Sequence, residues 1–276
     1  MASAFEHCAA LVRERDPDRF FATLFAPPER RPLLHALYAF HLEIVAIELR
    51  AVEPFPAEIR RQWWRDVVQG ERAGEASSSP VASALVAMLD ATGIARAPLI
   101  DLLDAYSDDP DTPESRAAFA AHALRIEGAV LRAASAILGV TDGVEAALAP
   151  ASVALAGSVA LRNLAARAAH GRIDIPADLL TRHRVPRNEI LAGVESPALR
   201  SAISEFRDAV ATAASEAIAA IAQMPAPARA AFLHVGLVPL YLARVARRDY
   251  APFRTVVEVP QWRRQWQLWR LARRLG

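Results

Sequence analysis

The acidic residues of this chain are the first candidates for chemistry, because carboxylates on facing helices can hold a divalent cation. Acids four residues apart project from one face of a helix, since four residues turn it by about 400°. Two such helices can hold Mg²⁺ together with substrate phosphates and help a diphosphate group to leave. Glu43 and Glu48 are five residues apart, so they point about 140° apart on one helix and do not form such a pair.

The remaining metal-ligating residues do not suggest a metal site either. Asp108, Asp109 and Asp111 lie in a proline-containing segment that we interpret as a solvated turn before the next helix. His41 and His170 lack a third ligand, so they do not make a zinc site. We therefore expect no metal.

Composition limits the class of protein. The chain has 276 residues and 53% hydrophobic content, enough for one sizeable core and no more than two domains. All 32 basic residues are arginine, and the net charge of +1 argues against nucleic acid as a partner. Cys8 is the only cysteine, which excludes an internal disulfide and a multi-cysteine zinc site.

No segment has the sequence of a secretory signal or a membrane span. Charged residues such as Glu6 and Arg13 interrupt the first 20 residues before an apolar run can form. The longest weakly polar stretch, 146–161, is too short to cross a bilayer and contains Pro150. We expect a cytoplasmic chain, or one on the inner face of the cytoplasmic membrane.

The elements that must position these residues are expected to be helices, because helical periodicity runs through most of the sequence. Glycine is scarce, with 11 residues, and apolar residues recur at steps of three and four, which predicts an all-α protein. Asp16-Pro17 is typical of a helix start. Loops are expected at 71–80 and 107–113. After the first of these, helices are expected at about 81–92, 98–106, 114–138, 151–169, 201–223, 228–247 and 260–275.

Four stretches resemble squalene and phytoene synthases, and the resemblance extends from about Phe20 to the C-terminus. They are 19–25 (RFFATLF), 30–40 (RRPLLHALYAF), 62–66 (QWWRD) and 171–176 (GRIDIP). The resemblance implies an all-α, single-domain helical bundle of the isoprenoid-synthase type, residues 1–276, around a central cavity. In that family, aspartates on two helices hold magnesium and a prenyl diphosphate.

The same resemblance implies that both aspartate clusters are absent here. Anchored on 37–40 and on 161–162 with 171–172, the family's metal positions fall on other residue types, without a gap. They are Val45, Ala46, Leu49, Asn163, Ala166 and Arg167. A guanidinium at position 167 would repel magnesium. The resemblance therefore implies no catalytic residue and no cofactor, with magnesium expected only if the chain is an active prenyltransferase.

Other positions keep the family's residue type. Arg30, Arg162 and Arg172 are basic where arginines of the family contact diphosphate, and they are candidate ligand-binding residues. They could equally pair with acidic neighbours or face water. Tyr38 lies either in the cavity wall or in the core.

One subgroup of the family fits better than the active synthases. The run 39–43 (AFHLE), the segment 62–65 (QWWR) and Arg162 without a following aspartate resemble the mitochondrial complex I assembly factors of the phytoene-synthase type. That resemblance implies a non-catalytic protein that assembles or scaffolds a membrane-associated complex such as respiratory complex I, through a protein partner.

The segment 260–275 is expected to form a basic, tryptophan-rich C-terminal helix. Arg263, Gln267, Arg270 and Arg274 form a polar stripe, and tryptophans and leucines fill the rest of the projection. Tryptophan with arginine suits a peripheral membrane contact. A helix packed on the bundle with its arginines in water is the alternative reading.

Three functional hypotheses follow, in order of preference. The first is a non-catalytic assembly or scaffold protein. The second is a protein that binds an isoprenoid or other lipid in the cavity. The third is a divergent head-to-head prenyltransferase of phytoene or squalene type, whose acids would be Glu43, Glu48 and Asp174.

Overall fold

The computed structural model describes residues 3–50, 54–108 and 110–275, without the side chains at 49, 50, 54, 55 and 73. Within these ranges the backbone forms helices and no strand, which confirms the all-α prediction. The first half contains α1 (Ala4–Arg15), α2 (Pro17–Thr23), α3 (Arg31–Arg50), α4 (Pro54–Gln69), α5 (Ala73–Ala76), α6 (Pro80–Thr92), α7 (Ala97–Ser107), α8 (Arg116–Ala123), η1 (Leu124–Gly128) and α9 (Ala129–Ile137). The second half contains α10 (Glu145–Arg162), α11 (Leu164–Ala169), α12 (Ala177–Arg182), α13 (Arg187–Leu191), α14 (Pro197–Gln223), η2 (Ala226–Ala228), α15 (Arg229–Phe232), η3 (Leu233–Leu237), α16 (Val238–Val245) and α17 (Gln261–Leu275).

Side-chain caps set several helix starts. Asp16 caps α2 by accepting a hydrogen bond from the Arg19 backbone N–H at 3.0 Å, and Pro17 occupies the first turn, as predicted. Ser196 caps the long helix α14 in the same way, followed by Pro197. Ser3 and Glu6 form a reciprocal capping box at α1.

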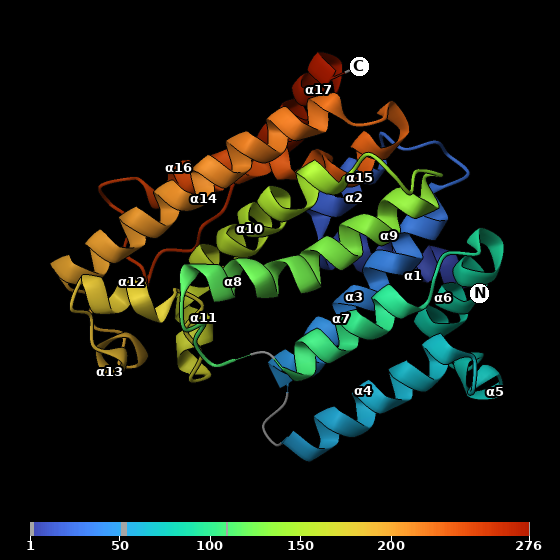
Figure 1. Ribbon diagram of the computed structural model, residues 1–276, viewed down its shortest axis with the longest axis horizontal. Helices are drawn as coiled ribbons and strands as arrows, with labels where there is room; N and C mark the ends of the chain where they lie inside the picture. The colour runs from blue at the N-terminus through green and yellow to red at the C-terminus, as the bar shows by residue number, and fades with distance from the viewer. Residues whose placement is uncertain (1–2, 51–53, 109, 276) are drawn as a thin grey trace.

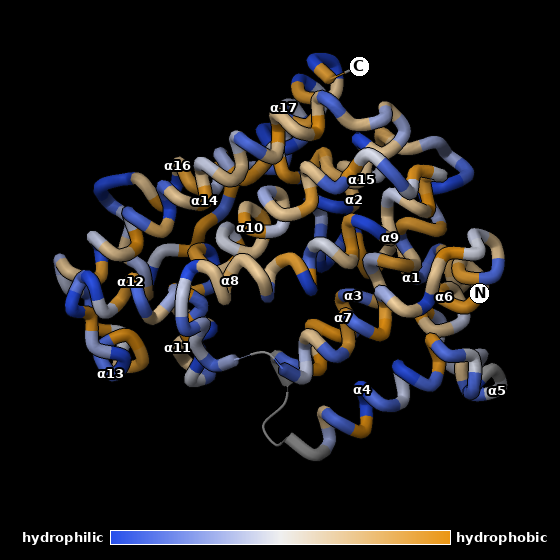
Figure 2. The backbone as a smooth tube through the Cα atoms, in the orientation of Figure 1, coloured by the Kyte–Doolittle hydropathy of each residue, from blue (hydrophilic) through white to orange (hydrophobic). Residues whose placement is uncertain are grey.

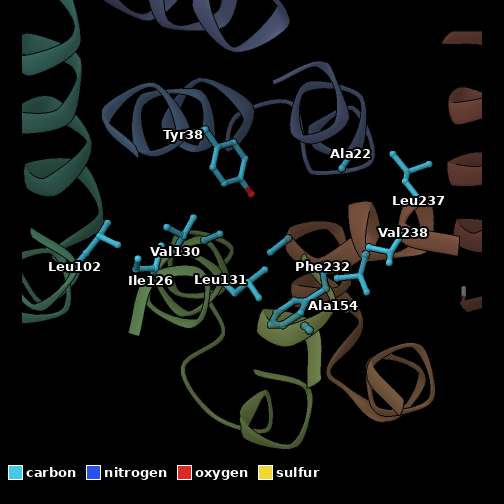
Figure 3. Close-up of a cluster of buried hydrophobic side chains, with 14 of the residues drawn as sticks. Ala22, Tyr38, Leu102, Ile126, Val130, Leu131, Ala154, Phe232, Leu237 and Val238 are labelled. Carbon is cyan, nitrogen blue, oxygen red and sulfur yellow. The ribbon is translucent and has the colours of Figure 1, made fainter. Parts of the chain in front are cut away.

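The helices pack around one continuous apolar core. α10 packs along α14, and α3 packs against α1, α6 and α9 (Figure 1). Individual helices such as α4 alternate between polar and apolar residues (Figure 2), so each can bury one face. Figure 3 shows part of this core, to which α3 contributes Tyr38, α7 contributes Leu102, α9 contributes Leu131 and α15 contributes Phe232.

Two expected helices contain an interruption. The predicted helix 114–138 is continuous but changes to π geometry in η1, between α8 and α9. The predicted helix 151–169 starts earlier and ends at Arg162, and Asn163 then turns the chain into α11. Both interruptions lie beside the candidate site, so they decide which side chains reach it.

Two further segments also differ from the sequence prediction. The expected loop 71–80 contains the short helix α5. The expected helix 228–247 is divided into η2, α15, η3 and α16, because 3-10 geometry interrupts the α-helix at 226–228 and 233–237. Among the described residues, this stretch (Ala226–Val245) is the one long and apolar enough to cross a membrane, and 61% of its window is buried in the bundle.

α17 presents two different apolar faces. Leu268 and Leu271 are buried against the bundle, next to η3. Trp262, Trp266 and Trp269 are exposed on the other side. The broad apolar circumference expected from the sequence therefore divides into a packed leucine face and an open tryptophan face.

The contact between α10 and α14 leaves no room for a side chain at Gly157. A Cβ there would lie 2.3 Å from Cγ2 and 3.2 Å from Cγ1 of Val210, which is fully buried. Valine is stiff at χ1 in a helix, so it cannot rotate away easily. We expect Gly157→Ala to lower the free energy of unfolding by about 1–3 kcal/mol through overpacking.

Gly74→Ala is the matched control, because a Cβ at Gly74 meets no atom within 4 Å. Chemical denaturation should show that this variant is unchanged or more stable by up to about 1 kcal/mol, the helix propensity gained over glycine. Equal stability of the two variants would contradict the close-packing argument.

Candidate functional site

A cavity of about 400 Å³ lies between α3, the π-helix η1, α10 and α11. Its wall combines nine apolar residues with ten polar ones. The apolar part is Leu42, Val45, Pro113, Phe119, Ala123, Ile126, Ala156, Val159 and Ala166, and the polar part is Asp16, Arg19, His41, Glu48, Tyr106, His122, Glu127, Asn163, Arg167 and Asp174.

Four of the six positions that the sequence analysis predicted to match the family's metal ligands line this cavity. They are Val45 on α3, Asn163 at the helix break, and Ala166 and Arg167 on α11. Ala46 faces a different cavity, between α3 and α4. Leu49 belongs to α3, but its side chain lies outside those that the structure describes.

Arg167 forms a bidentate ion pair with Asp174 in the cavity wall. Its Nε donates to Oδ2 of Asp174 at 2.8 Å and its Nη2 donates to Oδ1 at 2.6 Å. Both side chains are about four-fifths buried, with exposures of 21% and 17%. Planar two-point pairing of this kind fixes both groups, so Asp174 is held by a cation of the chain itself.

Arg19 of α2 is the most enclosed charge in the cavity wall. Its side chain is 7% exposed, and its Nη2 donates to Oε2 of Glu127 at 2.5 Å. Its Nη1 donates to Oδ2 of Asp16 at 3.2 Å and to Nδ1 of His41 at 2.9 Å. The guanidinium also lies 5.4 Å from the centre of the Tyr38 ring.

These contacts fix the protonation of the neighbouring histidine. A guanidinium only donates, so Nδ1 of His41 must accept, and the ring proton must sit on Nε2. Nε2 then donates to the Tyr106 hydroxyl at 2.8 Å. Burial, with Arg19 beside it, holds the pKa of His41 well below its usual range, which agrees with a neutral ring.

The other acids of the wall are paired as well. Glu48 accepts from Nη1 of Arg61 at 2.5 Å, and both side chains are about nine-tenths buried. Burial raises the pKa of Glu127, and the adjacent Arg19 opposes that rise. Each of the four carboxylates that line the cavity therefore has an arginine partner. In the part of the chain that the structure describes, no three His, Cys, Asp or Glu side chains are grouped to hold a metal ion.

The four predicted ligand-binding residues do not meet in this cavity. Tyr38 is 3% exposed and belongs to the core cluster (Figure 3), beneath Arg19. Arg30 lies half-buried in the turn before α3, and Arg172 half-buried after α11. Arg162 lines a second cavity of about 720 Å³ near α16 and α17, 3.8 Å from Asp18 and over the Tyr241 ring.

Comparison with known proteins identifies the family of this chain. The sequence pattern of squalene/phytoene synthases matches residues 12–270. The chain belongs to the squalene/phytoene synthase family. The resemblance expected from the sequence is therefore confirmed at the level of family and fold.

The relatives of this squalene/phytoene synthase family member include proteins that are named as assembly factors and not as synthases. Proteins of Rattus norvegicus and Homo sapiens, both named NADH dehydrogenase (ubiquinone) complex I, assembly factor 6, are each 23% identical to it. The matches cover 251 and 252 residues, 90% of this chain and 75% of each relative.

Solved structures share the fold. Squalene synthase HpnC from Alicyclobacillus acidocaldarius has a TM-score of 0.76 and 21% identity, over 91% of this chain and 95% of that one. A dehydrosqualene synthase in complex with ligand has a TM-score of 0.79 and 16% identity, over 99% and 96% of the two chains. YisP from Bacillus subtilis has a TM-score of 0.73 and 15% identity, over 96% and 94%.

Arg19, Glu127 and Tyr106 are cavity residues that the sequence reasoning did not select. Arg19 opens one of the four stretches that resemble the family, which is the only signal that could have directed attention to it. Glu127 comes from a segment expected to be an ordinary helix and pairs with a residue 108 positions away. No local pattern predicts such a pair.

Removing the Arg19 guanidinium should be costly. Arg19→Leu leaves Glu127 buried without its cation, and breaking a buried ion pair typically costs about 3–5 kcal/mol. We expect that loss in the free energy of unfolding, measured by chemical denaturation. Adding Glu127→Gln should recover part of it, because a neutral amide is cheaper to bury than a carboxylate.

Arg125→Leu is the matched control, on the π-helix itself. Arg125 pairs with Asp108 at 3.0 Å, with exposures of 46% and 64%. Exposed pairs contribute about 0–1 kcal/mol. If Arg19→Leu is no more destabilising than this control, the Arg19 network does not hold the cavity wall.

Proposed function

We propose that this chain is a non-catalytic member of the squalene/phytoene synthase family that acts in assembly or scaffolding of a membrane-associated complex, such as respiratory complex I. The observation that carries the proposal is the charge arrangement of the cavity. The positions aligned with the family's magnesium ligands there are Val45, Asn163, Ala166 and Arg167. The acids that remain are each paired with an arginine.

This arrangement does not fit a magnesium cluster. Magnesium needs carboxylate oxygens with free lone pairs in octahedral geometry. Asp174 already gives both oxygens to Arg167, and Glu127 is held by Arg19. A divalent cation in this cavity would also lie near two guanidinium groups, which repel it. The names of the rat and human relatives add support for an assembly role.

The proposal includes a place in the cell and a partner. We infer a cytoplasmic protein on the inner face of the cytoplasmic membrane, where a protein subunit of the complex would be its partner. The support is the distant similarity to the assembly factors and the exposed tryptophans of α17.

A second candidate function is binding of an isoprenoid or another lipid without diphosphate. The cavity itself favours it, because about 400 Å³ remains between α3 and α10 with walls that include Leu42, Phe119 and Val159. A volume of this size is within the range of small-molecule sites.

The first test is thermal unfolding with a non-hydrolysable farnesyl diphosphate analogue, with and without Mg²⁺. We expect no magnesium-dependent shift, because the acids of the cavity are paired within the chain. A ligand at a hundred times its dissociation constant would stabilise the native state by about 2.7 kcal/mol, which such an experiment detects.

Farnesol, which lacks the diphosphate, is the control ligand. Equal stabilisation by farnesol in both conditions would favour the lipid-binding candidate. Stabilisation by the analogue only when Mg²⁺ is present would show a working metal clamp and contradict the non-catalytic proposal.

The second test concerns assembly. Deleting the gene from a native host that has a complex I should reduce the assembled complex, measured by native electrophoresis and NADH oxidation by membranes. The intact chain should restore both. Unchanged complex in the deletion strain, together with loss of a prenyl product, would replace assembly with enzymatic activity.

A further inference from the structure

A second cavity, of about 720 Å³, gathers arginines between α16 and the start of α17. They are Arg162, Arg244, Arg247, Arg263 and Arg264, and Glu258 is the single acid in the lining. The lining therefore carries five cations against one anion, although the net charge of the whole chain is only +1. The cavity is therefore a local centre of positive charge.

Only some of these cations have partners. Asp18 accepts from Arg264 at 2.8 Å and lies 3.8 Å from Arg162, and Arg247 pairs with Asp249 at 2.9 Å. Among the described residues, neither Arg244 nor Arg263 has a carboxylate within ion-pair distance. The buried Nε of Arg244 also has no hydrogen-bond acceptor.

An anion with several oxygens could accept the hydrogen bonds that these guanidinium groups have to offer. Guanidinium groups bind phosphate oxygens through paired hydrogen bonds. The first residue of α17, Gln261, belongs to the lining. The N-terminal end of this 15-residue helix adds a partial positive charge at the cavity. The chemistry of the cavity thus favours a phosphate group.

The surface next to the cavity indicates where the phosphate comes from. Trp262, Trp266 and Trp269 are 67%, 56% and 42% exposed, and the last two stack with ring centres 4.9 Å apart. At about 100° per residue, the three indoles lie within an arc of about 60°. Arg263 and Arg270 lie beside this arc, both on the same side of it, and no acidic residue occurs in α17.

The rotation of α17 is fixed by its other face. A Cβ on Gly236 of η3 would lie 2.3 Å from Cδ2 of Leu271, so the leucine packs directly on the glycine backbone. Gln267 donates to the Gly236 carbonyl at 3.2 Å. The tryptophans therefore point outward with no alternative place in the core.

We propose that α17 and the arginine cavity form a docking site for a bilayer that contains anionic phospholipid. A headgroup phosphate occupies the cavity beside Arg244 and Arg263, and the indoles of Trp262, Trp266 and Trp269 lie at headgroup depth. Tryptophan prefers this interface, and arginine is attracted to an anionic leaflet. The site does not depend on an assembly role, since any peripheral protein could use it.

The test is sedimentation of the full chain with vesicles of phosphatidylcholine alone or mixed with phosphatidylglycerol. Binding is expected only to the mixed vesicles, with weakening at high salt. Arg244→Gln with Arg263→Gln should weaken it by about 25-fold, roughly fivefold for each cation. Trp262→Ala with Trp266→Ala should also weaken it and reduce the blue shift of tryptophan emission, because only Trp269 of the three indoles remains.

Arg132→Gln with Arg184→Gln is the matched control, because it removes the same charge from exposed positions outside the cavity. Circular dichroism should show that all three variants are folded, as expected for changes at exposed or half-buried side chains. Equal loss of binding in the control and the cavity variant would show that binding depends on the total positive charge and not on the cavity. That result would overturn the proposal.

Two further outcomes would also overturn it. Equal binding to vesicles of phosphatidylcholine alone would remove the role of the arginine cavity. Stabilisation by inorganic phosphate at millimolar concentration, without binding to either vesicle, would assign the cavity to a soluble phosphate compound. Either outcome would also remove the support that the α17 tryptophans give to a membrane location, but neither bears on complex I assembly, so failure here and failure of the assembly role can be distinguished.

Discussion

A buried guanidinium needs hydrogen-bond acceptors and negative charge on several sides at once. Three segments of the bundle supply them to Arg19. Asp16 reaches it from the cap of α2, His41 from α3, and Glu127 from the π-helix. An unpaired charge at this depth would cost several kcal/mol, so the three segments must keep their relative positions. The adjacent cavity therefore has a rigid wall, whatever it holds.

Much of the helical layout follows from local sequence. Asp16-Pro17 predicted a helix start, and the three-and-four periodicity predicted the helices because both are local effects. The break at Asn163 was not predicted, since the alanine-rich segment 158–170 contains no glycine or proline. The π-helix was missed for a similar reason, because its geometry depends on what α8 and α9 pack against.

The candidate site was only partly predictable. Anchoring on family-like segments brought Val45, Asn163, Ala166 and Arg167 to one cavity, because a helix preserves spacing. The same reasoning did not place Tyr38 or Arg162, whose positions depend on how distant helices pack. A helical projection of α17 identified an apolar circumference, but it could not separate leucines that pack on Gly236 from tryptophans that face solvent.

The π-helix makes the position of a charge depend on the number of residues in a helix. A π turn is an α-helix with one residue inserted, so its two flanks are out of phase by about 100°. Deleting one residue within Leu124–Gly128 would restore α geometry and turn one flank relative to the other. Either Glu127 would leave Arg19, or Val130 and Leu131 would leave the core. At this point of the chain, a change of length shifts every following side chain at once, whereas a substitution changes only one.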